Sequence, residues 1–442
     1  MEVKDSTSLA RAVLRSLRHR NFRLFTVGQT ISLVGTWVQQ VAVGWLVYRL
    51  TDSALMLGLV SFAAQGPTFV LAPLAGAIAD RGNRHRLLIA VQSLMMVQAL
   101  VLATLVLTGV IQIWHIVVLS AVLGCLSGFD IPIRQSFLVE MVEGKEDLSN
   151  AIALNSSMFN SARLVGPAIA GFAISLVGEG ICILINGLSY LAVLAALLAM
   201  RVRPPAVHAH HEPMLARIRA GFDYAFSFTP IRSVLMLVAL VSLTAVPFSV
   251  LLPVVAGSVL AGDAKTLGVL VSSTGAGALA AALYLAGRQS VRGLGRVIAV
   301  SCSLFGISLL AFSVSRAWWL SAGILVFAGF GMMLQMASSN TFLQTVVDDD
   351  KRGRILSLYT MAYIGTAPVG SLLMGWVAEH LGAPTALAIG GASCLVFAAA
   401  FGRRLPDFRA QVRPIYVRMG IIPELATGIQ AATQTTTSEE VG

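Results

Sequence analysis

A few charged and amide side chains lie inside long apolar runs of this chain, where they could bind an anion or take up a proton. Arg163 lies about 12 residues into the apolar run 151–177, roughly 18 Å along a helix. A charge at this depth is costly, so it should face a cavity or a partner. We expect Arg163 and the nearby Asn160 to contact a substrate. A structural ion pair or carbonyl contact would use Arg163 equally well.

Asp130 and Arg134 end another apolar run and are four residues apart, which places them on one helix face. No other acidic residue lies so far inside an apolar run, so Asp130 is the candidate for proton uptake. The sequence also allows a purely structural arrangement at an inner gate. Arg134 would then pair with Asp130 or with Asp80.

Two stripes of amide and hydroxyl side chains accompany these charges. The first lies on the run 23–48 and contains Gln29, Thr36 and Gln40, with Trp37 beside it; the second contains Gln335 and Ser339. We expect both stripes to line the substrate cavity. Hydrogen bonds between helices, without any substrate, would use the same residue types.

Patterns typical of catalysis are absent from the sequence, which has no phosphate-binding loop, no glycine-rich dinucleotide turn and no Ser-His-Asp set in register. The four cysteines lie in apolar segments without metal or disulfide spacing. We therefore expect no enzyme, no cofactor and no metal site.

The composition is that of a polytopic membrane protein. Of the 442 residues, 56% are hydrophobic and only 12% are charged, whereas soluble proteins carry about 25% charged residues. The mean hydropathy is +0.80. The net charge of +10 comes from short loops between apolar runs, so it does not indicate nucleic-acid binding.

Twelve apolar runs are long enough to cross a bilayer as helices. None alternates as a barrel strand would, so the sequence predicts an all-α membrane protein. The runs are 23–48, 54–79, 87–108, 113–133, 151–177, 180–200, 231–260, 265–287, 296–315, 317–338, 355–378 and 383–402.

Basic residues orient the predicted helices in the membrane. With the N-terminus inside, 27 of the 31 Lys and Arg residues lie in inner segments, and the outer segments hold only Arg49, Lys265 and Arg316. The positive-inside rule then places both termini in the cytoplasm.

The runs divide into two sets of six that repeat. Phe137-Leu138 corresponds to Phe342-Leu343, and GPAIAG (166–171) corresponds to GSLLMG (370–375). Parallel repeats of this kind place a binding site between the halves. The expected organisation is a cytoplasmic amphipathic arm (1–22), a six-helix bundle (23–200), a cytoplasmic linker (201–230), a second six-helix bundle (231–402) and a cytoplasmic tail with a disordered end (403–442).

The loop GAIADRGNRHR (76–86) resembles the signature of the major facilitator superfamily between its second and third helices. Gly76, Asp80, Arg81 and Arg84 match the signature, whereas Asn83 and His85 depart from it. Gly76 would let the helix end pack closely. The resemblance implies that Asp80, Arg81 and Arg84 couple closure of the inner gate to movement of the halves. A basic positive-inside loop is the alternative.

The stretch containing Gly166, Pro167 and Gly171 resembles a degenerate form of the antiporter motif of that superfamily, with Ala162 and Ala170 in place of two glycines. This motif favours exporters, and we assign these residues, with Gly76 and Arg134, to gating. Small residues at this spacing also serve ordinary helix packing.

Residues 22–51 and 128–171 resemble the bacterial branch of the superfamily that includes the enterobactin exporter and the transmembrane secretion effectors. This resemblance implies a transporter of the bacterial inner membrane, and we expect it to be a monomer. We expect proton-coupled export, by alternating access, of a siderophore, a drug or a similar small amphiphile. An importer of the same fold and a non-transporting membrane sensor or assembly protein are the alternatives.

Overall fold

The computed structural model describes residues 15–142, 146–201, 222–288 and 290–419, and every regular element in these ranges is helical. Eleven of the described helices are long and apolar enough to span a membrane. The N-terminal group comprises η1 (Arg15–Arg18), α2 (Arg20–Thr51), α3 (Ala54–Arg81), α4 (Arg84–Leu107), α5 (Ile113–Leu138), η2 (Val139–Met141) and α6 (Leu148–Ala199).

The C-terminal group begins after the predicted linker, most of which, at 202–221, lies outside the described residues. Its elements are α8 (Thr229–Thr244), η3 (Val246–Leu251), α9 (Leu252–Val254), η4 (Val255–Val259), α10 (Ala264–Ala286), α11 (Leu294–Val314), α12 (Trp318–Val346), α13 (Asp349–Thr360), η5 (Met361–Gly365), α14 (Ala367–Leu381), α15 (Ala383–Arg403) and α16 (Leu405–Arg418).

Helix α6 explains why eleven spans are found where the sequence predicted twelve runs. The predicted runs 151–177 and 180–200 both lie in this 52-residue element, which is broken at Gly178. The backbone of Gly178 has φ 78° and ψ 168°, a left-handed conformation that a residue with a Cβ adopts at a cost. Just beyond the break, Glu179 accepts two hydrogen bonds from Arg49, at 2.9 and 3.3 Å, and so ties α6 to the end of α2.

Proline interrupts the first long segment of the C-terminal group. The α-helical part ends at Thr244, a 3₁₀ turn follows from Val246, and a π turn occupies Val255–Val259. Pro247 and Pro253 lie in this stretch and cannot donate helical hydrogen bonds. A second π turn, Met361–Gly365, separates α13 from α14.

Asp147 fastens the start of α2 to the start of α6. Its buried carboxylate forms ion-pair contacts with Arg15, with Arg18 at 2.8 Å and with His19 at 2.8 Å. The His19 hydrogen bond, together with the two arginines, holds the pKa of Asp147 below its usual value. The charged form is therefore favoured, and the cluster persists until the pH falls through that lowered pKa. The predicted arm before Arg15 lies outside the described residues.

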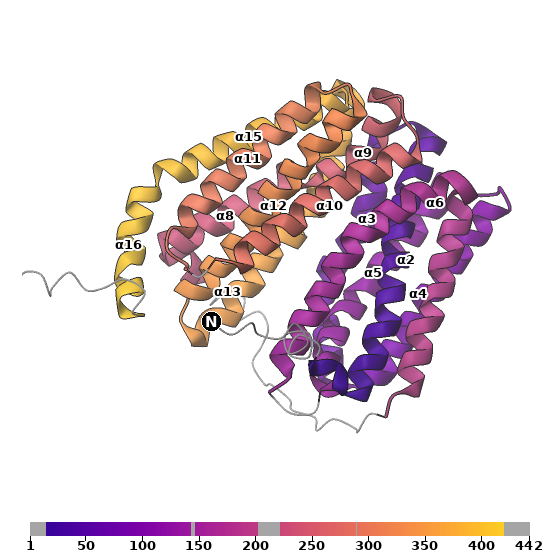
Figure 1. Cartoon of the computed structure of the whole chain (residues 1–442), viewed down its shortest axis with the longest axis horizontal. Helices are drawn as coiled ribbons and strands as arrows, with labels where there is room; N and C mark the ends of the chain where they lie inside the picture. The colour runs from indigo at the N-terminus through magenta and orange to yellow at the C-terminus, as the bar shows by residue number, and fades with distance from the viewer. Residues whose placement is uncertain (1–14, 143–145, 202–221, 289, 420–442) are drawn as a thin grey trace, which may run out of the picture.

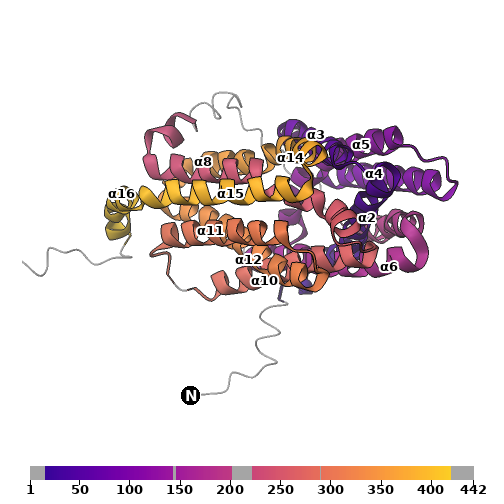
Figure 2. The same cartoon turned by 90° about the horizontal axis from the view of Figure 1, so that it is seen from above.

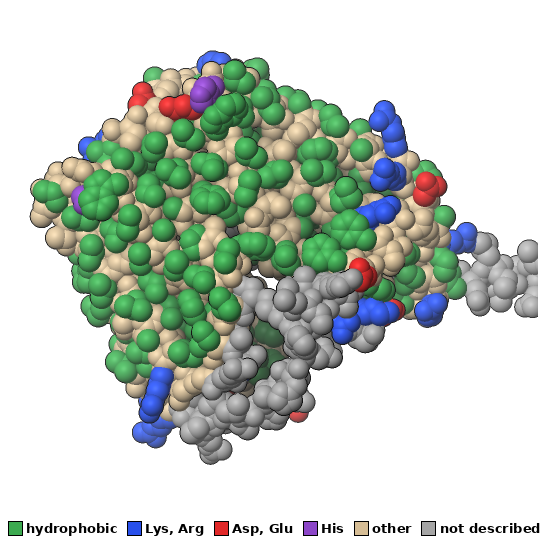
Figure 3. Space-filling model, turned by 180° about the vertical axis from the view of Figure 1, so that it is seen from behind, with side chains coloured by type: hydrophobic (Ala, Val, Ile, Leu, Met, Phe, Trp, Pro, Cys, Tyr) green, Lys and Arg blue, Asp and Glu red, His purple; other side chains and the backbone are tan. Residues whose placement is uncertain are grey.

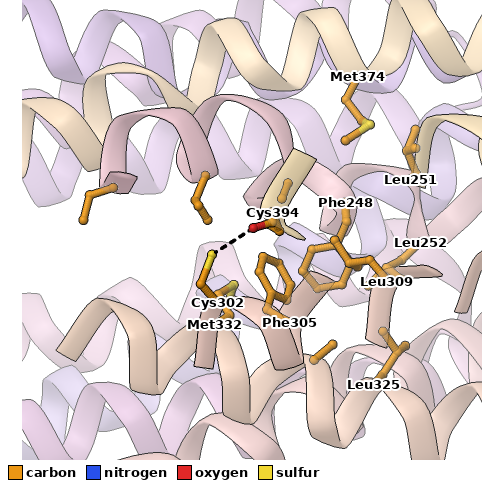
Figure 4. Close-up of a cluster of buried hydrophobic side chains, with 14 of the residues drawn as sticks. Phe248, Leu251, Leu252, Cys302, Phe305, Leu309, Leu325, Met332, Met374 and Cys394 are labelled. Carbon is orange, nitrogen blue, oxygen red and sulfur yellow. Dashed lines mark hydrogen bonds between the residues drawn. The ribbon is translucent and has the colours of Figure 1, made fainter. Parts of the chain in front are cut away.

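Aromatic and aliphatic side chains fill the interior of the C-terminal group (Figure 4). Phe248 meets Phe305 edge to face, with ring centroids 5.7 Å apart, and Leu309 and Leu325 are fully buried in the same cluster. Cys302 donates a long Sγ contact of 3.5 Å to the carbonyl oxygen of Cys394. These cysteines pack as small apolar residues within the core.

The two groups lean together at one end and diverge toward the other (Figure 1), and they stay on opposite sides in the perpendicular view (Figure 2). We call the end where they meet the joined end; it comprises residues 48–61, 171, 257–268 and 371–379. Two helix pairs cross there, α3 with α14 and α6 with α10.

Glycines bring the backbones into direct contact at both crossings. A Cβ added to Gly268 would lie 2.6 Å from the Cα of Gly171, and one added to Gly375 would lie 3.1 Å from the Cα of Gly58. Small residues permit such approach between membrane helices, where apolar side chains gain little by leaving lipid. The joined end therefore depends on the absence of side chains at these positions.

Polar contacts reinforce the joined end. Glu379 on α14 accepts hydrogen bonds from the Ser53 hydroxyl at 2.9 Å and from the Leu55 N–H at 3.1 Å, at the start of α3. A carboxylate is favourable beside the free N–H groups of a helix N-terminus. The hydroxyls of Tyr48 and Ser258 share a further hydrogen bond of 2.9 Å.

We predict that Gly268→Val forces the joined end apart, because the added methyl groups would overlap the backbone of Gly171. Overpacking of this kind costs about 1–3 kcal/mol. Spin labels at the exposed positions Leu50 and Leu381 should then report longer distances. Gly323→Val is the matched control, since a Cβ at Gly323 meets nothing within 4 Å. Equal distances in both variants would contradict the prediction.

We also predict that Glu379→Ala loosens the first turn of α3, since Leu55 loses its acceptor from the other group. Loss of a helix cap typically costs about 0.5–2 kcal/mol. Amide hydrogen exchange at Leu55 should accelerate in Glu379→Ala and less in Glu379→Gln, which keeps an acceptor oxygen. Exchange at the wild-type rate in both variants would rule out this role of Glu379.

Candidate functional site

Asp130 lies in a buried polar cluster between α4 and α5. Gln92 donates a hydrogen bond of 2.7 Å to one carboxylate oxygen, and Arg134 lies 3.1 Å from the other. Asp130 is only 5% exposed and Gln92 only 2%. The predicted pair between Asp130 and Arg134, one helical turn apart, is thus confirmed.

Arg134 extends this cluster toward α6. Its guanidinium group lies over the ring of Phe159, 4.5 Å from the centroid, and Phe159 directly precedes Asn160 in the chain. A cation stacked on an aromatic face keeps a favourable contact even where water is scarce. The cluster therefore connects a carboxylate on α5 with the stretch of α6 on which the sequence placed substrate contacts.

Chemically, the cluster can hold or release one proton. A buried ion pair is favourable only while both charges are present, and neutralising one partner leaves the other buried and uncompensated. Proton uptake by Asp130 would thus leave the Arg134 guanidinium group without its counter-charge on the same helix, α5. Gln92 was not predicted, although its place as an amide inside an apolar run was a visible signal.

The predicted stripe on α2 divides between buried and accessible positions. Gln29 is 4% exposed, and its Oε1 atom has no hydrogen-bond partner among the described residues. Thr36 donates to the Ser32 carbonyl oxygen at 2.9 Å, whereas Gln40 is exposed. Trp37 packs against α6 at Gly166, where an added Cβ would collide with it.

Gln39, beside the predicted Gln40, makes the buried contact. Asn186 on α6 donates a hydrogen bond of 2.7 Å to its side-chain oxygen, and both residues are nearly inaccessible. The sequence analysis did not identify this pair. An amide-to-amide bond of this kind holds α2 against the second arm of α6.

The backbone of Asn160 and Arg163 lies in the first arm of α6, but their side chains lie outside the part that the structure describes. The same stretch packs on α2, because Met158 and Ala162 are buried with Leu33. Within the N-terminal group, the first arm of α6 thus packs on the part of α2 that carries the predicted stripe.

Gln335 and Ser339 on α12 are buried, with exposures of 1% and 0%. Ser339 donates to the Gln335 carbonyl oxygen at 2.7 Å, so the two residues bond to each other along one helix. More accessible amides occur one turn further on, where Gln344 donates to the Asn340 side chain at 2.6 Å.

The loop between α3 and α4 is held by Arg84, which forms an ion pair of 2.7 Å with Glu140. Asn83, which departs from the family signature, caps α4 by accepting from the Arg86 N–H at 3.1 Å. The side chains of Asp80 and Arg81 lie outside the described part.

The close packing expected at Gly76 is wrong, since an added Cβ would meet nothing within 4 Å. The contacts between glycine backbones of the two groups, Gly171 with Gly268 and Gly58 with Gly375, lie instead at the joined end.

The three residues from the antiporter-like stretch, Gly166, Pro167 and Gly171, lie within two turns of α6. Gly166 touches Trp37 within the N-terminal group, whereas Gly171 touches Gly268 of the C-terminal group. The carbonyl oxygen of the buried Pro167 would lie 3.0 Å from a Cβ on Gly268. Gly268 and Glu379 were not predicted, because contacts between distant segments leave no local pattern.

Comparison with known proteins gives relatives along most of the chain. It is 27% identical over 383 residues to a staphyloferrin A transporter of Staphylococcus aureus, covering 86% of this chain and 95% of that protein. It is 24% identical over 377 residues to an enterobactin exporter of Escherichia coli O1:K1 / APEC, covering 84% and 88% respectively.

A solved structure of a peptide transporter, POT, matches the fold with a TM-score of 0.70 at 11% identity, covering 89% of this chain and 95% of that one. The model of the transmembrane secretion effector family matches residues 11–418. The chain is therefore a multi-pass membrane transporter rather than an enzyme. It belongs to the transmembrane secretion effector family of the major facilitator superfamily.

Proposed function

We propose that this transporter exports a small amphiphile, a siderophore or a drug, in exchange for protons across the bacterial inner membrane. The observation that carries the proposal is the buried cluster of Asp130, Gln92 and Arg134, a protonatable site inside a membrane transporter. The likeness to an enterobactin exporter supports the direction and the substrate class. Ionisable residues within membrane segments commonly belong to proton or substrate pathways.

The proposed architecture is twelve spanning helices in two six-helix bundles, 23–200 and 231–402. The break at Gly178 supports this count, because it divides the 52 residues of α6 into two arms. Residues 1–22, 201–230 and 403–442 form the arm, linker and tail on the cytoplasmic side. One chain suffices for the site, so we propose a monomer.

The joined end faces outward in this proposal. Arg49 and Lys265, two of the three basic residues assigned to outer segments, lie at or beside it. The groups diverge toward the opposite end, where α2 begins (Figure 1). The arrangement thus corresponds to the inward-open half of an alternating-access cycle, in which the two bundles rock about a central site.

Gating residues would act at both ends during this cycle. Gly166, Pro167 and Gly171 accompany the outer contact that must open for release, with Gly171 directly on Gly268. Gly76, Asp80, Arg81, Arg84 and Arg134 belong to the inner side that must close. The ion pair between Arg84 and Glu140 lies on this inner side.

Substrate would bind between the bundles, near the predicted contacts Gln29, Thr36, Trp37, Gln40, Asn160, Arg163, Gln335 and Ser339. Arg163 would be the deep positive charge of the cavity and would favour an anionic or neutral substrate. A proton moving inward in exchange is worth about 2.3 kcal/mol per 100 mV of membrane potential.

We predict that Asp130→Asn uncouples transport from protons, because an amide cannot take up a proton at this site. A pH gradient would be imposed across inside-out vesicles, and enterobactin or staphyloferrin A would then be added. Substrate-driven proton release should fall about tenfold or more, a common size for coupling between two binding events. Asp223→Asn, at an exposed carboxylate, is the control and should behave as wild type.

Proton release at the wild-type rate in Asp130→Asn would remove Asp130 from the mechanism. Substrate movement that ignores the pH gradient in the wild type would remove proton coupling itself. Entry of substrate into right-side-out vesicles, driven by the same gradient, would reverse the direction to import.

We further predict that Arg163→Ala weakens binding of anionic ligands about 10–100-fold, since hydrogen bonds to a charged group contribute about 1.5–3 kcal/mol. Arg163→Lys should retain part of this affinity. Equilibrium binding of one anionic and one neutral probe to the purified protein measures both effects. Unchanged affinity for the anionic probe in Arg163→Ala would contradict the proposed role.

A further inference from the structure

Helix α16 is amphipathic and packs across the ends of four helices of the C-terminal group, α8, α11, α12 and α15. Its buried residues Phe408, Val412 and Tyr416 recur every four positions and form one face. Phe408 packs against Phe342, with ring centroids 4.8 Å apart. The helix is therefore a fixed part of the fold.

Tyr416 places α16 beside the loop between α10 and α11, because its hydroxyl donates to the Val291 carbonyl oxygen at 3.4 Å. Phe408 also reaches Gly295, where an added Cβ would lie 2.9 Å from its ring. Residues from two distant parts of the chain thus share one corner of the molecule.

This corner is strongly basic. We name it the basic corner and define it by seven exposed arginines: Arg292, Arg296, Arg403, Arg404, Arg409, Arg413 and Arg418. The only acidic residue of α16 is Asp407. Within the described ranges, none of the seven side chains forms an ion pair. Lys and Arg side chains gather at the corresponding edge of the space-filling view, next to the broad apolar face (Figure 3).

Unpaired guanidinium groups at the edge of an apolar surface fit one kind of partner. Lipid acyl chains cover such a surface, and lipid phosphates lie at its border. Arginine binds phosphate through two parallel hydrogen bonds, which lysine cannot do. Arg403 ends the last apolar helix, so the basic corner begins where the apolar surface stops.

We propose that the basic corner binds the phosphate headgroups of anionic phospholipids in the leaflet that it faces. In the orientation given under the proposed function, on which this location rests, that is the cytoplasmic leaflet. Basic segments directly after a spanning helix recognise anionic lipids in this way. The corner is separate from the Asp130 cluster, which lies in the N-terminal group.

The test uses the full chain, purified and exchanged into equal parts phosphatidylglycerol and phosphatidylcholine, with retained lipids counted by native mass spectrometry. Wild type should retain phosphatidylglycerol preferentially. Changing Arg409, Arg413 and Arg418 together to Gln should reduce that preference about tenfold or more, since each basic residue near the surface adds to the attraction. These exposed substitutions leave the buried face of α16 intact.

The matched control changes Arg20, Arg23 and Arg86, three exposed arginines of the N-terminal group, to Gln and removes the same charge. It should retain phosphatidylglycerol as wild type does. Equal losses in both triple variants, or no preference in wild type, would overturn the proposal. Displacement of the lipid by millimolar inorganic phosphate would also overturn it and indicate a simple anion site. The readout needs no transport, so failure of proton-coupled export would leave its result unaffected.

Discussion

Direct backbone contact between helices of the two groups is the interaction on which the whole arrangement depends. Lipid tails are as apolar as leucine, so helices in a membrane gain little by burying apolar side chains against each other. Close approach and hydrogen bonds must supply the attraction instead. The glycine crossings and the Glu379 contacts do so, and both lie at the joined end. The opposite ends of the helices diverge (Figure 1).

The Asp130 cluster follows a second constraint, the cost of charge in an apolar region. Gln92 and Arg134 both contact the Asp130 carboxylate, and Phe159 covers the guanidinium group. Neutralising Asp130 would leave the Arg134 guanidinium group buried without its counter-charge and free to change its contact with Phe159 on α6. A proton bound on one group can thereby change the packing between helices of the same bundle. The proposed proton coupling relies on this property.

The helices and their irregularities could be predicted from local sequence, because apolar length, Pro247 and the i, i+4 spacing of Asp130 and Arg134 act over a few residues. The partners of these residues could not. Gln92 and Glu379 meet their targets across 38 and 324 residues of sequence, and only packing decides that. The burial of the neighbouring amides Gln39 and Gln40 was equally hard to predict, since a small rotation of α2 decides which of them is buried.

The crossing of Gly171 with Gly268 limits how mutations there can be compensated. In most helix contacts, a larger residue on one side can be accommodated by a smaller one opposite. Here both partners already lack a side chain, and the atoms that meet belong to the backbone. A suppressor of a substitution at either position therefore cannot arise at the other. It must shift a whole helix or remove another contact of the joined end, which couples the two glycines genetically to positions they do not touch.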